Sequence, residues 1–309
     1  MIISVLGSAA GGGLPQWNCR GANSATARSN QALVKPRTQS SLAVSADGKR
    51  WLLLNASPDL REQIGRHAFL HPDSDGPLRN SPIGAVALTN ADVDHIAGLL
   101  TLREGHAFGV YASPRVLAVL DANSIFNVLD RQIVDRIPLE VDRPSMVLGG
   151  SGSGGQLTVT AFLVPGKVAL FLEDKSSGAD LGTRDGDTIG LEISDGASRF
   201  HYIPGCAFID GALRQRLKAS PLVFLDGTLF TDDEMIAQGL SQKTGKRMGH
   251  ISMSGPQGSL AALAGLDIGR RVYIHMNNSN PVLREDSPER AEVERQGWEV
   301  AFDGMELRL

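Results

Sequence analysis

The Asp94-His95 pair is the strongest candidate in this sequence for residues that bind a metal ion. It ends the segment Thr-Asn-Ala-Asp-Val-Asp-His (residues 89–95), which follows an apolar run over residues 83–88 that predicts a buried strand. Residues 96–100 then predict the start of a helix. Polar side chains in a loop between a strand and a helix point away from the core, and carboxylate oxygen with imidazole nitrogen suits a metal ion. The pair therefore predicts a metal site at this strand end.

The same segment resembles the metallo-β-lactamase signature Thr-His-x-His-x-Asp-His. The final Asp-His of that signature falls on Asp94 and His95, whereas Asn90 and Asp92 stand where the signature has its first two His. In that superfamily the first two His help to hold one metal ion, and the Asp-His pair helps to hold a second. The resemblance implies that this chain has lost the first site and kept the second. Asn90 and Asp92 are then candidates to orient His95 or a bound water.

The resemblance also implies two further ligands of the second site, a bridging Asp and a late His. Asp226 follows one predicted buried strand and His275 follows another, which fits the gathering of ligands at strand ends in α/β sheets. The remaining His of the first site has no counterpart, because Pro165-Gly166-Lys167 follows the strand where it is expected. Every first-site His is therefore absent, and every second-site ligand is present.

Each match has an ordinary alternative. Asp94-His95 could be a helix cap beside a surface His, Asp226 with its following Gly could be a simple turn, and His275 could be a hydrogen-bonded structural residue. Three matches at strand ends in the right order favour the metal site. His250, which follows a Gly in a loop, is either a pocket residue that binds metal or carries a proton, or a plain surface residue. Both interpretations of His250 stay open.

Longer motifs indicate which family of this superfamily the chain resembles. They stand at residues 7–19 (Gly-Ser-Ala-Ala-Gly-Gly-Gly-Leu-Pro-Gln-Trp-Asn-Cys), 36–41, 55–61, 102–105, 226–228, 277–281, 287–292 and 302–305 (Phe-Asp-Gly-Met). Together they closely resemble the PqqB family of pyrroloquinoline quinone (PQQ) biosynthesis, over essentially the whole chain. A phosphodiesterase of phosphonate metabolism shares the Trp-x-Cys loop and the Phe-Asp-Gly-Met ending. It keeps the full His motif, however, so this chain departs from it at the metals.

The family resemblance implies an iron-dependent hydroxylase. Its substrate would be the tyrosine ring of a Glu-Tyr-derived PQQ precursor, with Fe(II) as cofactor and O₂ as co-substrate. Two imidazoles and two carboxylates suit non-haem Fe(II), and zinc is a possible substitute. The expected metal ligands are Asp94, His95, Asp226 and His275, and the expected catalytic residues are His250 and Asp92. Two alternatives stay open: a one-zinc hydrolase of a peptide intermediate, and a non-catalytic carrier of PQQ or its precursor.

A small precursor with several carboxylates needs cationic partners. The candidate substrate-binding residues are Arg37, Arg103, Lys167 and Arg247, with Gln39 and Asn277 as neutral partners. Trp17 is a candidate to stack on the aromatic ring of the substrate, although a Trp in a loop as often only packs against its own loop. Since most Arg side chains only keep a surface soluble, each of these assignments is a separate hypothesis.

The N-terminal loop departs from the resembled family. Relatives carry a Cys-x-Cys-x-x-Cys run that holds a structural zinc, whereas here Cys19 is followed by Gly21 and Ser24 at the other two positions. One thiolate cannot supply the four ligands of such a site, so we expect no structural zinc. Residues 20–36 are rich in Ser, Ala and Asn, and we expect a mobile surface loop there.

Composition is typical of a soluble enzyme. The chain has 309 residues, of which 42% are hydrophobic and 21% charged, enough for a sizeable core. A net charge of -4 without a basic block argues against nucleic-acid binding. Two distant cysteines argue against a disulfide framework. We expect no signal peptide, no membrane segment and a cytoplasmic location, and a homodimer is one candidate assembly.

Thirteen strands and seven helices are expected. The strands are residues 2–6, 41–44, 51–55, 84–89, 109–112, 157–164, 168–172, 189–193, 200–203, 222–226, 271–275, 299–302 and 306–309. The helices are residues 58–66, 95–103, 114–120, 211–218, 232–238, 258–264 and 288–296. This alternation predicts an α/β (α+β) fold, the αββα sandwich of metallo-β-lactamases, as a single domain over residues 1–309. The Gly-Ser run at 149–155 is the expected junction of its two halves.

Overall fold

The computed structural model describes residues 1–149, 155–173 and 182–309, and within them the strands form two seven-stranded sheets. The first sheet has the order β14 (Glu306–Arg308), β1 (Ile2–Gly7), β2 (Ser41–Ser45), β3 (Trp51–Leu54), β4 (Ile83–Ala87), β5 (Phe108–Ala112) and β6 (Val134–Pro138). The second has the order β13 (Glu299–Val300), β12 (Ile268–Ile274), β11 (Ser220–Asp226), β10 (Arg199–Ile203), β9 (Ile189–Ser194), β8 (Leu157–Leu163) and β7 (Pro144–Leu148).

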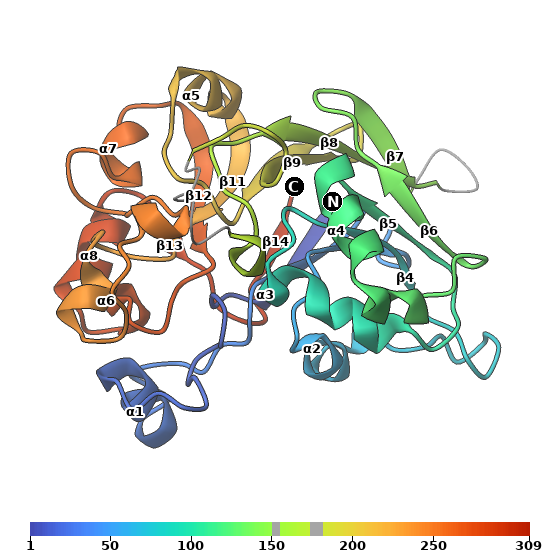
Figure 1. Cartoon of the computed structure of the whole chain (residues 1–309), viewed down its shortest axis with the longest axis horizontal. Helices are drawn as coiled ribbons and strands as arrows, with labels where there is room; N and C mark the ends of the chain where they lie inside the picture. The colour runs from blue at the N-terminus through green and yellow to red at the C-terminus, as the bar shows by residue number, and fades with distance from the viewer. Residues whose placement is uncertain (150–154, 174–181) are drawn as a thin grey trace.

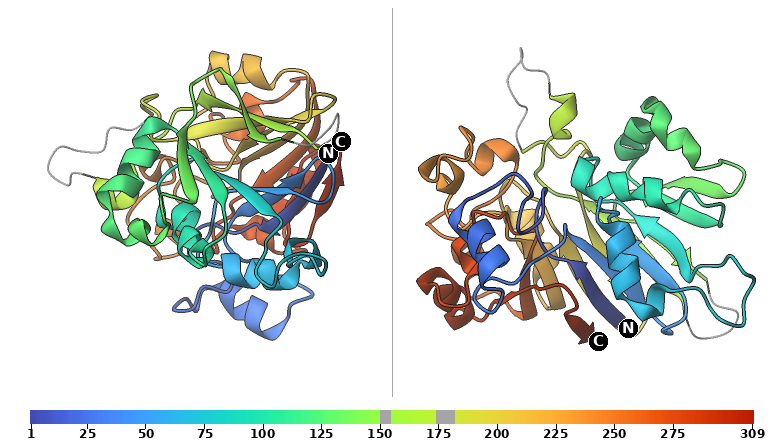
Figure 2. Two further views of the ribbon diagram at one scale, coloured as in Figure 1. Left: turned by 90° about the vertical axis from the view of Figure 1, so that its right-hand side faces the viewer. Right: turned by 90° about the horizontal axis from the view of Figure 1, so that it is seen from below.

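Both sheets are mixed in the same way. Strands β3 to β6 are parallel in the first sheet, and β10 to β13 are parallel in the second, while the remaining neighbours are antiparallel. The chain ends meet in the first sheet, where β14 pairs with β1, so that the two termini lie side by side (Figures 1 and 2). Parallel strands place their carboxyl ends at one edge, and such edges are where ligands gather.

Helices flank the two sheets (Figures 1 and 2). They are α1 (Ala22–Ser29), α2 (Leu60–Arg66), α3 (Val93–Ile96), α4 (Pro114–Ala122), α5 (Gly211–Leu217), α6 (Glu234–Ala237), α7 (Ser259–Ala262) and α8 (Pro288–Arg295). The starts of α4 and α8 follow from the sequence, because Ser113 and Ser287 each cap a helix that has Pro in its first turn. The predicted αββα arrangement is confirmed.

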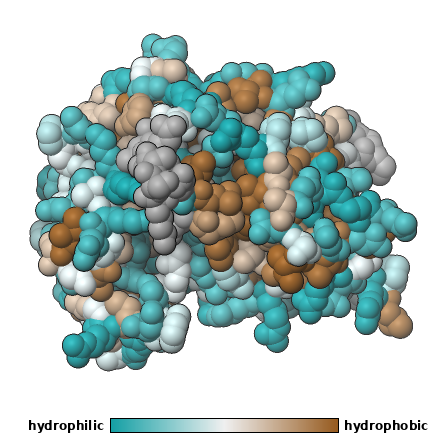
Figure 3. All heavy atoms as spheres, viewed as in Figure 1, coloured by the Kyte–Doolittle hydropathy of each residue, from teal (hydrophilic) through white to brown (hydrophobic). Residues whose placement is uncertain are grey.

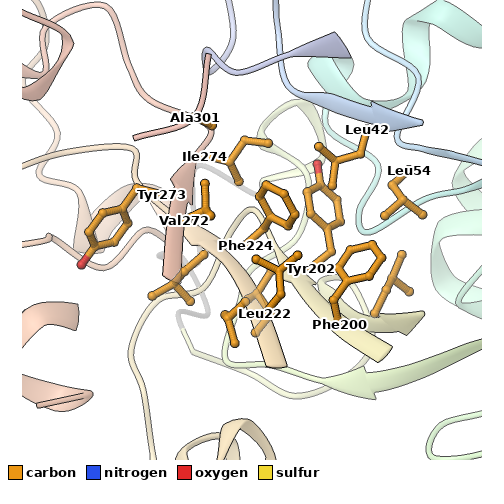
Figure 4. Close-up of a cluster of buried hydrophobic side chains, with 14 of the residues drawn as sticks. Leu42, Leu54, Phe200, Tyr202, Leu222, Phe224, Val272, Tyr273, Ile274 and Ala301 are labelled. Carbon is orange, nitrogen blue, oxygen red and sulfur yellow. The ribbon is translucent and has the colours of Figure 1, made fainter. Parts of the chain in front are cut away.

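The main core lies between the two sheets. Figure 4 shows Leu42 and Leu54 of the first sheet facing Tyr202 and Phe224 of the second, and all four side chains are buried. Alternation along β12 sends Tyr273 to the opposite side, where its ring stacks on Trp298 at 4.1 Å between centroids. Apolar burial on both faces explains why these strands have nearly continuous apolar sequences. A truncation such as Phe224→Ala is expected to cost about 3–5 kcal/mol.

A second core lies between the first sheet and its helices. It contains apolar side chains of α2 and α4, such as Leu60, Val116 and Leu120, packed on the outer face of β3 to β5. This layer fixes the position of the loop after β4, which carries Asp94 and His95. Nowhere in the described ranges is there a helix with the length and apolar character needed to cross a membrane.

The fold departs from the sequence-based expectations in a few places. Residues 20–36, expected to be a mobile loop, contain α1. The Asn23 amide attaches this helix to the C-terminal part of the chain, because it donates to the carbonyls of Asn278 and Asn280 at 2.9 Å each. Residues 168–172 contain a 3₁₀ turn (Leu170–Leu172) instead of a strand. Strands β6 and β7 were missed. The chain changes sheets between these two strands, before the expected junction at 149–155, of which residues 150–154 lie outside the described residues.

Candidate metal centre

The carboxyl ends of β4, β11 and β12 meet at a cavity of about 270 Å³. Asp94 and His95 reach it from the short helix after β4, and His275 reaches it from the first residue after β12. The three donor groups lie within 4.8 Å of one another. His275 has a φ of 62°, a left-handed conformation that a bulky side chain rarely adopts. Such a conformation persists where the surroundings hold it, as is common at functional sites.

The tautomer of His95 follows from its neighbours. The Asn90 side-chain oxygen accepts the backbone N–H of Asp92 at 3.0 Å, which fixes that atom as an acceptor. The same oxygen lies 2.7 Å from His95 Nδ1, so Nδ1 carries the hydrogen and Nε2 keeps its lone pair. His95 Nε2 is buried, and no described residue makes a hydrogen bond with it. A buried lone pair without a partner is costly, and a metal ion would satisfy it.

Thr228 sets the tautomer of His275 in the same manner. Its hydroxyl donates to Asp226 Oδ1 at 2.7 Å, so its oxygen accepts from His275 Nδ1 at 2.9 Å. The remaining lone pair of His275, on Nε2, faces Asp94 Oδ2 at 3.0 Å. Two electron-rich atoms at that distance repel unless a proton or a metal ion lies with them. Both histidines therefore present Nε2 to the same carboxylate.

Asp226 belongs to a second group of donors, with His250 and His275, also within 4.8 Å. Its Oδ2 accepts from His250 Nδ1 at 2.8 Å and from the backbone N–H of Cys206 at 3.0 Å, and its Oδ1 accepts twice from Thr228. The carboxylate thus has four acceptor contacts within the protein. The structure places His250, but not Asp226, on the wall of the cavity.

The charges of the site follow from burial and from these pairs. Burial would raise the pKa of Asp94, but the His95 and His275 rings hold it well below its usual range. Burial lowers the pKa of His95 to about 4 against the opposing effect of Asp94, so that ring is neutral at neutral pH. Burial would lower the pKa of His250 as well, but the charge and hydrogen bond of Asp226 raise it. The site holds anionic carboxylates beside at least one neutral imidazole.

These residues fit a divalent metal ion. The partnerless His95 Nε2, the free lone pair of His275 and the ionised Asp94 converge as two imidazoles and one carboxylate, a set that suits zinc or iron. Asn90 and Thr228 orient the rings through the opposite nitrogen, which is the usual second layer of a metal site. Asp92 lines the cavity next to them.

The N-terminal motif braces this cavity without supplying a donor to it. Gly11 lines the cavity, and a Cβ added there would lie 3.6 Å from the Asp94 carboxylate. Gln39 supports the loop, because its side-chain oxygen accepts the Gly12 N–H at 3.1 Å while its amide nitrogen donates to Asp59 at 3.0 Å. Gln39, predicted to contact substrate, therefore lies outside the cavity wall and has its contacts within the protein.

Arg37, another predicted substrate contact, is buried elsewhere. Its guanidinium donates to the carbonyls of Ala301 and Lys35, and burial lowers its pKa to about 10. Asp303, in the Phe-Asp-Gly-Met motif, accepts from Ser8 and Thr38 beside it. These long-range contacts explain the motifs near both ends of the chain, because they fasten the N-terminal loop to the C-terminal segment.

The remaining predicted substrate contacts divide into two groups. Lys167 and Asn277 line the cavity, and Arg247 lies close to Lys167 because both contact Glu173. Arg103 lies on the surface, where it pairs with Glu104. The Trp17 side chain is 86% exposed and does not line the cavity. A loop position in the sequence does not reveal on which side of the molecule a long side chain lies.

Sequence reasoning missed part of the cavity wall. Thr228, Met235, Lys243 and Met248 line it. Thr228 carried a signal, since it follows Asp226 directly in a motif of the resembled family. Met235 and Lys243 carried none, because only the folded path of residues 230–250 brings them to the cavity.

Comparisons with known proteins agree with this geometry. Residues 50–276 match the β-lactamase superfamily domain. The chain is 52% identical to coenzyme PQQ synthesis protein B of Xanthomonas euvesicatoria over the full length of both proteins. It is also 52% identical to the protein of that name from Gluconacetobacter diazotrophicus, covering 99% of this chain and 98% of the relative.

Solved structures give the same result. The Zn²⁺-bound PqqB of Methylobacterium extorquens is 51% identical over the full length of both chains, with a TM-score of 0.95. A diphosphatase of the PhnP family, 18% identical and covering 100% of this chain and 97% of its own, has a TM-score of 0.65 and shares the fold. The resemblance seen in the motifs is confirmed: the chain belongs to the PqqB family, coenzyme PQQ synthesis protein B, within the metallo-β-lactamase superfamily.

Proposed function

We propose that the chain acts in PQQ biosynthesis as an iron-dependent hydroxylase of the tyrosine ring in a Glu-Tyr-derived precursor. Relatives named coenzyme PQQ synthesis protein B, alike over their full length, support the pathway. The observation that carries the chemistry is the donor group Asp94, His95 and His275, beside which Asn90 and Asp92 stand at the positions of the first-site His residues. A site without the second metal lacks half of the two-metal hydrolytic machinery.

The balanced reaction inserts one oxygen atom of O₂ into an aromatic C–H bond and releases the other as water. Two electrons and two protons come from an external reductant, for which ascorbate serves in an assay. Bound Fe(II) would supply the activation of O₂ at this site. Asp94, His95 and His275 would hold it, and the cavity of about 270 Å³ beside them would hold the ring.

Protein residues would position the ring and handle its proton. Met235 and Met248 give the cavity wall polarizable apolar surface, which suits an aromatic ring. His250 donates from Nδ1 to Asp226, which leaves its Nε2 as the atom that exchanges a proton with a bound phenol. Asp92, on the same wall, adds negative charge that favours the protonated form of His250.

The test is anaerobic loading of the metal-free chain with Fe(II), followed by ascorbate, isotopically labelled O₂ and a Glu-Tyr peptide. Mass spectrometry should find one labelled oxygen atom on the tyrosine ring, with iron and not with zinc. The cross-linked Glu-Tyr precursor is the second substrate to try. If neither substrate gains oxygen while the protein holds iron, the hydroxylase assignment is wrong.

Asp94→Asn tests the site assignment, because the variant keeps the shape of the side chain and removes its charge. It should abolish iron binding and oxygen insertion together while the protein stays folded. Full iron content and full turnover in this variant would contradict the site assignment itself.

A zinc hydrolase is the second candidate, and one observation favours it: the relative from Methylobacterium extorquens is Zn²⁺-bound. Imidazole and carboxylate donors hold zinc as readily as iron. The same experiment separates the two candidates. Cleavage of the peptide bond by the zinc-loaded chain without O₂ would establish the hydrolase.

A further inference from the structure

Four charged side chains form a cluster beside the metal cavity. Lys167, Lys243 and Arg247 surround the carboxylate of Glu173, and we call these four residues the Glu173 cluster. Lys167 Nζ lies 3.4 Å from one carboxylate oxygen, and Lys243 Nζ lies 3.7 Å from the other. The Arg247 guanidinium approaches both oxygens, at 3.3 and 3.4 Å.

The cluster carries more positive than negative charge. In the described part of the chain, Glu173 is the one acidic group within ion-pair distance of these three cations. Three positive charges against one leave a formal excess of two. Lys167 and Lys243 both line the metal cavity, so this excess charge faces the space next to Asp94 and His95. Asp92 and Asp94 line the same cavity, so the positive charge is local to Lys167 and Lys243, and there it attracts anions.

Glu173 is held loosely for a buried carboxylate. Its side chain is only 8% exposed, and that of Lys167 is 9% exposed. Charge-assisted hydrogen bonds are normally about 2.7–2.9 Å long, whereas every cation in this cluster lies at least 3.3 Å away. The surroundings thus stabilise a carboxylate by charge without locking it in place. The lowered pKa of Glu173, which burial alone would raise, reflects those same cations.

We propose that Lys167, Lys243 and Arg247 form a carboxylate-binding subsite and that Glu173 is its internal occupant, displaced when a polycarboxylate substrate enters the cavity. The inference rests on the proposed function only in treating this cavity as the substrate site. A carboxylate is the class of ligand that the cluster already accommodates, and Arg247 faces it with the planar fork that suits two oxygens. Glu173 then acts as a specificity residue, because only a ligand with competing anionic groups displaces it.

The neighbouring apolar surface favours a ligand with an aromatic body. Phe171 and Leu172 directly precede Glu173 and are 49% and 46% exposed, and Met235 and Met248 line the cavity. Figure 3 shows a largely hydrophilic face with apolar side chains gathered near its middle. The subsite therefore fits an aromatic or tyrosine-derived molecule with several carboxylates.

The probe is trimesate (benzene-1,3,5-tricarboxylate), titrated calorimetrically into the zinc-loaded chain without O₂ or reductant. Glu173→Gln removes the competing charge and should tighten trimesate binding about tenfold. Lys243→Met should weaken it about fivefold, in the range of a partly exposed ion pair. Lys246→Met is the matched control, because Lys246 lines a different cavity and has no contact with Glu173, and it should change nothing.

Each outcome decides for or against the subsite. Unchanged or weaker binding in Glu173→Gln would overturn it, and equal losses in Lys243→Met and Lys246→Met would reduce it to general attraction of anions. If Glu173→Gln unfolds, Lys243→Met decides, since full trimesate affinity in that variant contradicts the proposal. Inorganic phosphate that displaces trimesate at a lower concentration than isophthalate would overturn the carboxylate assignment. A failed hydroxylation assay with the expected trimesate results would reject the proposed function alone.

Discussion

The side-chain oxygen of Asn90 lies 2.7 Å from Nδ1 of His95, at the position where the superfamily signature has its first metal-binding His. The residue that would be a ligand in a two-metal enzyme here orients the ligand of the other site. Because that oxygen also accepts the Asp92 N–H, it cannot turn away without breaking a second hydrogen bond. The lost site and the kept site are thus linked through one amide group.

Asn90→Ala should weaken metal binding about 10–100-fold, the usual effect of removing such a supporting hydrogen bond. The His95 ring would lose the acceptor that fixes its tautomer, although Thr89 Oγ1 lies 3.4 Å from the same nitrogen. The measurement is the dissociation constant of zinc in a competition with a chelator. Asn90→Asp keeps an acceptor oxygen at this position and should retain tight binding. Equal losses in both variants would show that Asn90 does not act through His95.

Thr228→Val should couple a loss of stability to a loss of metal affinity. The change keeps the volume of the side chain, but it leaves His275 Nδ1 without a partner and removes one of the four acceptor contacts of Asp226. A buried polar group without a partner costs about 1–3 kcal/mol. Urea unfolding of the metal-free variant measures this cost, and zinc competition measures the second effect. Unchanged zinc affinity would show that Thr228 serves the fold alone.

Much of the metal centre could be predicted because strand ends are readable in sequence. Apolar runs located β4, β11 and β12. Asp226 ends β11, His275 follows β12 directly, and Asp94 lies in the short helix after β4. The carboxyl ends of β11 and β12 share an edge because these strands are parallel neighbours, and the packing of the two sheets brings the end of β4 to the same cavity. The sequence could not show that Asp226 would turn toward His250, since that depends on the Thr228 hydroxyl and the Cys206 N–H.

The parts that could not be predicted depend on the paths of loops. Strands β6 and β7 have half-exposed, mixed sequences with Pro at one end, so their pattern resembles a loop. The sequence does not distinguish Arg37 and Arg103 from Arg247 as candidates. In the folded chain Arg37 is buried against the Ala301 carbonyl, Arg103 lies on the surface and Arg247 contacts Glu173. The sequence does not single out Glu173, because two of its three cationic partners, Lys243 and Arg247, are distant in sequence.

Glu234 should make stability depend on pH. Burial raises the pKa of this carboxyl to about 7, against hydrogen bonds from Ser279 and the Phe230 N–H, compared with an ordinary value of 4.5. Between these two values the folded chain holds a proton that the unfolded chain releases, so the free energy of unfolding falls as pH rises through this window. The loss is complete above pH 7 and amounts to at most about 3 kcal/mol.

Glu234→Gln isolates this effect, because the amide does not titrate. Urea unfolding of both proteins at pH 5 and pH 8 should show the variant gaining on the native chain as pH rises. A constant difference between the two proteins would mean that the carboxyl has an ordinary pKa in the folded state.

Gly249→Ala should harm both stability and substrate binding, whereas Gly255→Ala should harm stability alone. The two glycines have almost the same left-handed φ, 83° and 86°, so an added side chain is strained to the same degree at both, by about 1–2 kcal/mol. They differ in their surroundings: a Cβ on Gly249 would lie 2.9 Å from Lys167 Cγ, while a Cβ on Gly255 would meet nothing within 4 Å. Thermal unfolding should therefore show similar losses, and trimesate should bind more weakly only to Gly249→Ala, because Lys167 must move away from the Glu173 cluster. Equal trimesate affinity in the two variants would mean that the packing of Lys167 on Gly249 does not set the position of its ammonium group.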